Sequence, residues 1–135
     1  MSIEFKRMQT GATAQSITVG KHSFTADMSI PEGGDDAGPS PHDLYDAALG
    51  ACKALTILWY ANKKGIQIDD IHTSVNRDNS AEKVGVYRLD AHVQVSGNLS
   101  DEQIRELASV AEKCPVHKLM TAVTTEITTT VERLS

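Results

Sequence analysis

Hydrophobic and polar residues alternate through the first 30 residues of the chain, which is the pattern of half-buried β-strands. The alternation is visible over residues 3–7, at Ile17 and Val19, and again over residues 24–30. Gly20 lies between the last two runs and suits a tight turn. This part of the chain is therefore predicted to form a hairpin or a meander.

A long helix is predicted to follow a loop that is rich in glycine and proline. Ser40 is a good N-cap, Pro41 suits the first helical position, and Asp43 completes a capping box. Apolar residues then fall on nearly all faces of the helix, and Gly65 marks its end. A helix of this kind must be buried on most sides. In a chain this short, we expect a second subunit to provide part of that burial.

The rest of the chain alternates between strand-like and helix-like patterns. The predicted elements are strands over residues 66–77, 84–96 and 124–134, a helix capped by Ser100, and a short helix after Cys114. Runs of strands combined with separate helices are typical of the α+β class. The length of 135 residues fits one domain, residues 1–135.

Charge and composition narrow the range of functions. The formal net charge is −5 and the basic residues are scattered, which argues against a nucleic-acid partner. The sequence has no long run of uncharged apolar residues, so no membrane span is predicted. The N-terminus lacks an apolar signal region, and a cytoplasmic location is expected. The two cysteines of such a chain are not expected to form a structural disulfide framework.

Cys52 lies near the middle of the long apolar helix. A lone cysteine is most often a small buried hydrophobe, and a thiol in purely apolar surroundings is inert because burial raises its pKa. A reactive Cys52 therefore needs a nearby cation. Lys53 is predicted to point to another side of the helix, whereas His42 and Asp43 lie about 13–15 Å away along the helix axis.

Cys114 has a more suggestive local context. Pro115 suits the first helical position, which makes Cys114 the predicted N-cap of the short helix. Backbone N–H groups and the side chains of Lys113, His117 and Lys118 would then lower its pKa. Two alternatives stay open: a boundary residue with no redox role, and a ligand in a Cys114-x-x-His117 metal site. A single ligand pair is weak support for zinc, so no metal is expected.

The two cysteines together define the candidate chemistry. If folding brings their sulfurs together, one can attack a peroxide and become a sulfenic acid, and the other can resolve it as a disulfide. This requires Cα atoms within about 7 Å of each other. The chemistry needs no bound cofactor.

Two motifs resemble the OsmC/Ohr family of osmotically inducible and organic-hydroperoxide-resistance proteins. The segment Gly38–Cys52 is similar to the one that leads to the first family cysteine, and Ala111–Lys118 is similar to the one that holds the second. The order of the strands between them also resembles the family. The resemblance covers essentially the whole chain.

The resemblance implies an α+β fold in an intertwined homodimer, with long central helices at the interface and active sites between the subunits. It implies that Cys52 is the peroxidatic thiol for organic hydroperoxides or hydrogen peroxide, and that Cys114 is the resolving thiol. A dithiol reductant, which the sequence does not identify, would reset the disulfide. The expected activity is thus that of a cysteine-based peroxidase whose partners are a second copy of itself, the peroxide and the reductant.

The chain departs from the family pattern at three positions. One branch of the family has a glutamate directly after the proline that opens the helix, where this chain has His42 followed by Asp43. The same branch holds the thiolate with an arginine from the N-terminal hairpin, for which Arg7 or Lys21 is the candidate here. An aromatic residue often follows the first cysteine, and here it is Lys53. These departures keep a second function open, that of a non-enzymatic redox-sensing or small-ligand-binding dimer.

Overall fold

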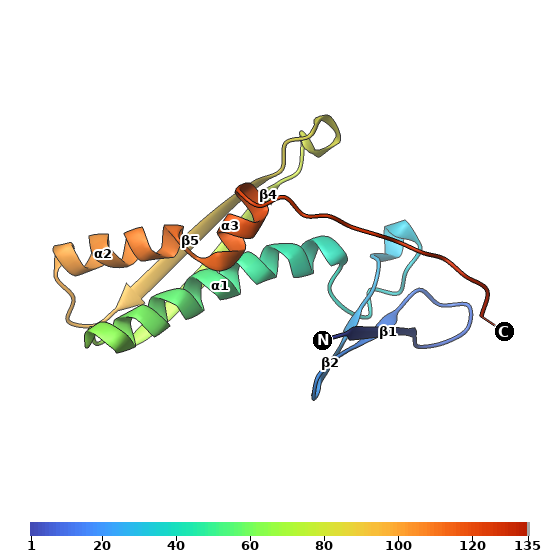
Figure 1. Cartoon of the computed structure of the whole chain (residues 1–135), viewed down its shortest axis with the longest axis horizontal. Coiled ribbons are helices and arrows are strands. Elements are labelled where there is room, and N and C mark those ends of the chain that lie inside the picture. Colours follow the sequence, from blue (N-terminus) through green and yellow to red (C-terminus); the bar gives the residue numbers. More distant parts are fainter. Residues whose placement is uncertain (135) are drawn as a thin grey trace. The chain divides into compact units, whose positions relative to one another are not determined.

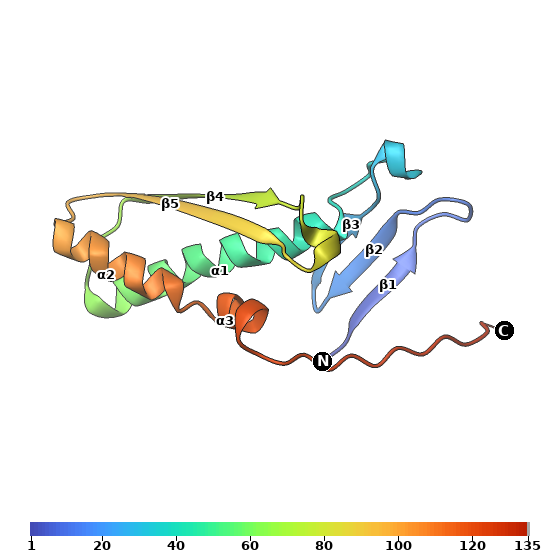
Figure 2. The same cartoon turned by 90° about the horizontal axis from the view of Figure 1, so that it is seen from above.

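In the computed structural model, which describes residues 1–134, the chain divides into two compact units, Met1–Ala48 and a second unit that begins at Leu49. The first unit carries an antiparallel meander in the order β1–β2–β3 (Figures 1 and 2). Its strands are β1 (Ile3–Arg7), β2 (Gln15–Val19) and β3 (His22–Ala26). Ile17, in the middle strand, is only 4% exposed. The predicted meander is confirmed.

The loop after β3 folds around a buried carboxylate. Asp27 is 4% exposed, and its oxygens accept a hydrogen bond from the Thr13 hydroxyl at 2.5 Å. They also accept three bonds from backbone N–H groups, those of Met28 at 2.7 Å, Asp35 at 3.0 Å and Ala37 at 3.1 Å. These bonds, with that of Thr13 the largest contributor, lower the pKa of Asp27 to about 2. The carboxylate therefore fixes the course of the loop.

Helix α1 (Pro41–Lys64) begins and ends at the predicted signals. The Asp43 N–H donates to Ser40 Oγ at 3.1 Å, and the Ser40 N–H donates to Asp43 Oδ2 at 3.0 Å. This is the reciprocal capping box expected from the sequence. At the other end, Gly65 adopts a left-handed conformation with φ +70°. Glycine enters this region without strain because it has no Cβ, which is why the helix stops here.

The second unit packs helices on one face of a two-stranded antiparallel sheet. Its elements after α1 are β4 (Asp70–Asp78), β5 (Arg88–Ser96), α2 (Asp101–Glu112) and α3 (Pro115–Thr121). Figure 2 shows α2 and the α1 segment of this unit along the same face of the β4–β5 hairpin. The core between these layers consists of Ile57, Ala61, Ile66 and Leu107, with Val93 and Val95 of β5 packed against it. Helix α2 begins at the capping box that the sequence predicts.

Two strands begin later than predicted because neighbouring turns occupy their first residues. Strand β4 begins at Asp70 rather than at Ile66, since the Ile66 N–H donates to the Ala61 carbonyl at 2.9 Å and still belongs to the end of α1. Strand β5 begins at Arg88 rather than at Val84, since Val84 is the last residue of a 3-10 turn. The inward positions of β5 alternate as predicted.

The predicted closing strand over residues 124–134 is wrong. This segment has no regular secondary structure, and its apolar residues Ile127 and Val131 are 81% and 95% exposed. A strand requires a neighbour that accepts its backbone hydrogen bonds, and no strand within residues 1–134 pairs with this segment. Sequence alternation alone cannot supply that neighbour.

The sequence predicts that α1 is buried on most sides, but within the single chain only one side is buried. Ile57 and Ala61 are 2% and 3% exposed, whereas Leu55 and Trp59 are 65% and 61% exposed. The β4–β5 hairpin and α2 cover one side of the helix, which leaves a second apolar side in contact with solvent. No helix within residues 1–134 combines the length and the hydropathy needed to cross a membrane.

Candidate active site

The two cysteine side chains meet although they lie far apart in the sequence. Cys52 is half-buried near the middle of α1, and Cys114 directly precedes α3 and is 0% exposed. The Cys52 side chain is close enough to Cys114 to raise the pKa of that thiol. Both are free thiols in this structure. The arrangement places a more accessible sulfur beside a fully buried one.

Cys114 is the N-cap of α3, as predicted, and Pro115 is the first residue of that helix. The predicted lowering of its pKa is wrong. Burial raises the pKa of the Cys114 thiol and is the largest effect, and the neighbouring Cys52 raises it further. The His117 backbone N–H and the positive charge of Lys53 act in the opposite direction without reversing the shift. The thiolate is therefore disfavoured because the site is dry.

Lys53 is a buried cation whose positive charge acts on Cys114. Its side chain is only 7% exposed, and Nζ donates to the Ala111 carbonyl at 2.9 Å. Nζ also lies 3.0 Å from Nδ1 of His117. A charged ammonium can only donate, so Nδ1 must accept and the imidazole carries its proton on Nε2. Lys53 thus links α1 to the chain on both sides of Cys114.

Sequence reasoning placed Lys53 on another side of the helix from Cys52 and therefore discounted it. The structure shows that this other side faces the α2–α3 connection. The available signal was a lysine inside a helical segment that is otherwise apolar, since such a lysine must find polar partners if the segment is buried.

Thr56 is a second residue that the sequence analysis did not single out. Its hydroxyl lies 3.9 Å from Cys52 Sγ, one helical turn further along α1. Either group can be the donor in this contact. A hydroxyl donor stabilises a thiolate more than a thiol. The spacing of four residues on one helix was the signal that could have found it.

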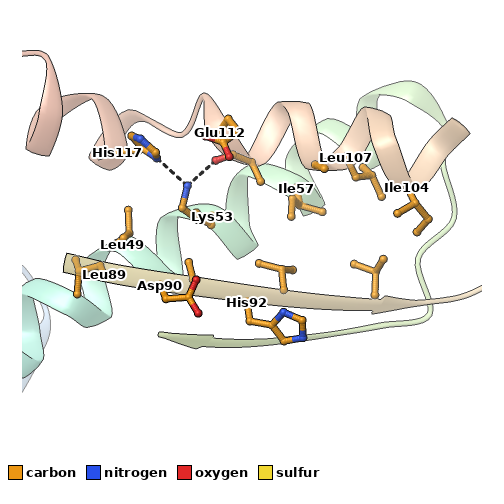
Figure 3. Close-up of a pocket in the computed structure, with 15 residues that line it drawn as sticks. Leu49, Lys53, Ile57, Leu89, Asp90, His92, Ile104, Leu107, Glu112 and His117 are labelled. Carbon is orange, nitrogen blue, oxygen red and sulfur yellow. Dashed lines mark hydrogen bonds between the residues drawn. The ribbon is translucent and has the colours of Figure 1, made fainter. Parts of the chain in front are cut away.

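A cavity of about 470 Å³ lies between α1, β5 and α2. Its wall is largely apolar and includes Leu49, Ile57, Leu89, Val93, Ile104 and Leu107. Figure 3 shows Lys53 and His117 pointing toward one another above this wall. The polar residues that line the cavity are Lys53, Asp90, His92, Glu112 and His117. An apolar cavity with a few convergent polar groups is the usual form of a small-molecule site.

The supporting residues expected from the sequence belong to the first unit, whereas both thiols belong to the second. Arg7 is the exposed last residue of β1, and His42 is exposed in the first turn of α1. Asp43 is engaged in the capping box with Ser40. A role for these three residues at Cys52 stays a prediction.

Metal binding was the competing interpretation of Cys114 and His117. Within residues 1–134, no group of three or more histidine, cysteine, aspartate or glutamate side chains is arranged to hold a metal ion. The Nδ1 atom of His117 faces Lys53 instead.

The family model and the similar solved structures point to the same protein family. A family model described as OsmC-like protein matches residues 33–130, whereas no curated protein matches the chain. An OsmC like protein from Mycoplasma pneumoniae is 20% identical, covering 90% of this chain and 87% of its own, with a TM-score of 0.72.

Two further solved structures carry functional names. An organic hydroperoxide resistance protein OsmC from Legionella pneumophila is 21% identical over 90% of this chain and 88% of its own, with a TM-score of 0.65. The organic hydroperoxide resistance protein OhrB of Bacillus subtilis is 25% identical over 90% of both chains, with a TM-score of 0.57. These similarities establish the α+β fold that the sequence predicts.

Proposed function

This chain belongs to the OsmC-like protein family, and from that premise we propose that it is a cysteine-based peroxidase that reduces organic hydroperoxides. The observation that carries the proposal is the proximity of Cys52 and Cys114, which come from distant segments and yet are close enough for Cys52 to raise the pKa of Cys114. Two proteins of similar fold are named organic hydroperoxide resistance proteins. The function is thus inferred from a pair of thiols on a fold that hosts such proteins.

The proposed cycle begins at the more accessible thiol. The Cys52 thiolate attacks the terminal oxygen of the peroxide, the O–O bond breaks, and the alcohol leaves with a proton. Cys52 is now a sulfenic acid. The Cys114 sulfur attacks the Cys52 sulfur, a disulfide forms, and the hydroxyl group leaves as water. A dithiol reductant then returns both thiols by disulfide exchange. Hydrogen peroxide would react in the same way and release water in place of the alcohol.

The assignment of roles follows from exposure and contacts. Cys52 is half-buried and can meet a substrate, whereas Cys114 is 0% exposed and can meet only its neighbours. The Thr56 hydroxyl at 3.9 Å can donate to a thiolate at Cys52. Cys114 is therefore suited to the second step, in which the electrophile is Cys52 itself.

A homodimer is part of the proposal. The solvent-facing side of α1 carries Leu55 and Trp59, which are 65% and 61% exposed. Large apolar side chains that share one side of a helix are typical of a surface that another chain covers. A second copy of the chain would bury them. Analytical ultracentrifugation of the wild type and of Leu55→Glu tests this, with a dimer expected for the first and a monomer for the second.

Peroxide consumption tests the catalytic proposal. The wild type, Cys52→Ser and Cys114→Ser are mixed with cumene hydroperoxide and dithiothreitol, and the peroxide that remains is measured over time. We expect turnover by the wild type and loss of at least about a hundredfold in Cys52→Ser, because the nucleophile is gone. Cys114→Ser should form a sulfenic acid that dimedone traps. Equal turnover by Cys52→Ser and the wild type would overturn the proposal.

Redox sensing without turnover is the second candidate, and the raised pKa of Cys114 favours it. A resolving thiol that is seldom ionised closes the disulfide slowly, which suits a stoichiometric sensor better than a fast enzyme. The same assay separates the two functions. A sensor consumes about one equivalent of peroxide per chain and then stops or turns over very slowly, even with excess dithiothreitol.

A further inference from the structure

We infer that Lys53 supplies the positive charge that holds the Cys114 thiolate during disulfide closure, and is thus a positioning residue for the resolving step. This inference rests on the proposed peroxidase function and adds to it a source of positive charge at the second thiol. It assigns a task to a buried cation that the first step of the cycle does not use.

The position of Lys53 is fixed by the segment that carries Cys114. Its Nζ donates to the Ala111 carbonyl at 2.9 Å and lies 3.0 Å from His117 Nδ1. These two residues stand on either side of Cys114 in the sequence, three positions before it and three after it. The ammonium is therefore anchored across the short connection between α2 and α3, at the level of the resolving thiol.

The charge of Lys53 is not cancelled by these partners. A carbonyl oxygen and a neutral imidazole satisfy two ammonium N–H groups, but neither carries a negative charge. Lysine usually extends to water, and here the side chain is 7% exposed. Asp90 and Glu112 line the same cavity, but the hydrogen bonds of Lys53 go to the carbonyl oxygen and the imidazole. Because Lys53 is largely buried, water screens its field less than that of a surface ammonium. A group on which this charge acts is the Cys114 thiol, which develops a negative charge in the proposed cycle.

Cys114 needs such a charge more than Cys52 does. Its side chain is 0% exposed, and burial raises the pKa of this thiol. The charge of Lys53 lowers the pKa and so opposes the effect of burial. In the resolving step the Cys114 thiol gives up its proton, its thiolate attacks Cys52, and the leaving hydroxide takes up a proton as water. Lys53 stabilises the Cys114 thiolate after it loses its proton and before it attacks Cys52.

Other lysines near Cys114 in the sequence do not share this setting. Lys113 and Lys118 are both exposed. Water and salt screen the field of an exposed ammonium, so its charge has little effect on the pKa of a neighbouring thiol. Lys113 is directly bonded to Cys114 along the chain and thus provides a matched control for the loss of one positive charge.

Ionisation of Cys114 is measured in a Cys52→Ser background by thiolate absorbance at 240 nm as a function of pH, which requires no reagent to reach the buried sulfur. The signal of a variant that lacks both cysteines is subtracted. We expect Lys53→Met to raise the midpoint by about one pH unit, and Lys113→Met to shift it by much less. Lys53→Arg should keep the midpoint close to that of the parent, because it retains the charge. If Lys53→Met fails to fold, Lys53→Gln replaces it.

Disulfide closure is then followed in the chain with both cysteines, after one equivalent of cumene hydroperoxide. A pKa rise of one unit cuts the thiolate fraction tenfold but makes each thiolate more nucleophilic, so closure in Lys53→Met should slow about threefold. The yield of dimedone adduct at Cys52 should rise accordingly. Lys113→Met should close at the rate of the wild type.

The outcomes separate the two proposals. If the peroxidase proposal fails, cumene hydroperoxide gives neither adduct nor disulfide in the wild type, while the absorbance titration still reports the effect of Lys53 on Cys114. If the wild type cycles but Lys53→Met and Lys113→Met have the same midpoint and the same closure rate, the inference about Lys53 is overturned and the peroxidase proposal stands.

Discussion

The first unit of the chain buries the charged side chains of Asp27 and Asp46, and the second buries that of Lys53. Asp27 and Lys53, with 4% and 7% of the residue exposed, differ in how they are held. Their partners differ in number and in origin. Asp27 accepts four hydrogen bonds, three of them from backbone N–H groups within ten positions of it. Lys53 has two partners, and both come from a segment more than fifty positions away.

The difference separates a charge that maintains the fold from one that is available for chemistry. Both oxygens of Asp27 are occupied, and the donors belong to the loop that the carboxylate organises. Lys53 lines a cavity, has only neutral partners, and lies beside a thiol on which its charge acts. A buried charge with local, saturating partners is a structural element, whereas one with few, distant partners is a candidate for function.

The largest effect on stability is expected from Asp27→Asn. The amide replaces one acceptor oxygen by an NH₂ group, which faces backbone N–H donors that cannot accept from it. We expect the thermal midpoint to fall by at least about 5 °C and amide exchange at Asp35 and Ala37 to accelerate. Asp36→Asn is the matched control, since Asp36 is exposed in the same loop and its φ of 53° suits asparagine. Equal midpoints for the two variants would contradict the structural role of Asp27.

The same carboxylate predicts a pH dependence. The pKa of Asp27 is about 2 in the folded chain against 3.8 for a free side chain, so the unfolded state binds more protons between these values. Its contribution to stability is therefore complete above about pH 4 and is lost as the pH falls toward 2. Urea denaturation of the wild type and Asp27→Asn at several pH values should show a gap in midpoint that narrows over this interval. A gap that persists unchanged at pH 2 would be inconsistent with an ionised Asp27.

Lys53→Met should affect stability much less than Asp27→Asn. Methionine has a similar volume and removes a desolvated charge, and this gain offsets the hydrogen bonds that the Ala111 carbonyl and His117 Nδ1 lose. We expect the thermal midpoint to stay within about 3 °C of the wild type, even though disulfide closure slows. Differential scanning calorimetry of the reduced proteins measures this. A fall as large as that of Asp27→Asn would make Lys53 a structural charge and remove the contrast between the two units.

Sequence patterns predicted those features that depend on neighbours along the chain. The capping box of Ser40 and Asp43 and the helix end at Gly65 are local signals, and both were correct. The position of Cys114 as an N-cap was also correct, but its pKa was not, because burial by distant segments outweighs the local dipole.

The partners of Lys53 were out of reach for a similar reason. Helical periodicity gives the side of α1 on which Lys53 lies, but not which segment packs there. The same limit explains the closing strand predicted for residues 124–134, whose alternation was correct and whose pairing partner was not present within residues 1–134. Sequence therefore defined the elements and the two thiols better than it defined the contacts among them.

The smallest effects are expected from two threonines, Thr56 and Thr73. In the described part of the chain, the hydroxyl of the first contacts the Cys52 thiol, whereas that of the second has no such contact. Thr56 Oγ1 lies 3.9 Å from Cys52 Sγ, whereas Thr73 Oγ1 is buried and has no hydrogen-bond partner within residues 1–134. Valine keeps the shape of threonine and removes the hydroxyl. Thr73→Val should raise the free energy of unfolding by about 1 kcal/mol, because an unsatisfied polar atom is removed.

Thr56→Val should instead slow the oxidation of Cys52 by about twofold to fivefold, which corresponds to the loss of one weak hydrogen bond to the thiolate. Stopped-flow measurement of the first reaction with cumene hydroperoxide gives this rate, and urea denaturation gives the stability of both variants. The effect is small because hydrogen bonds to sulfur are long, and because Cys52 keeps its contact with Cys114. If Thr73→Val slows oxidation as much as Thr56→Val, the change reflects packing of α1 against β4, and Thr56 has no specific role at the thiol.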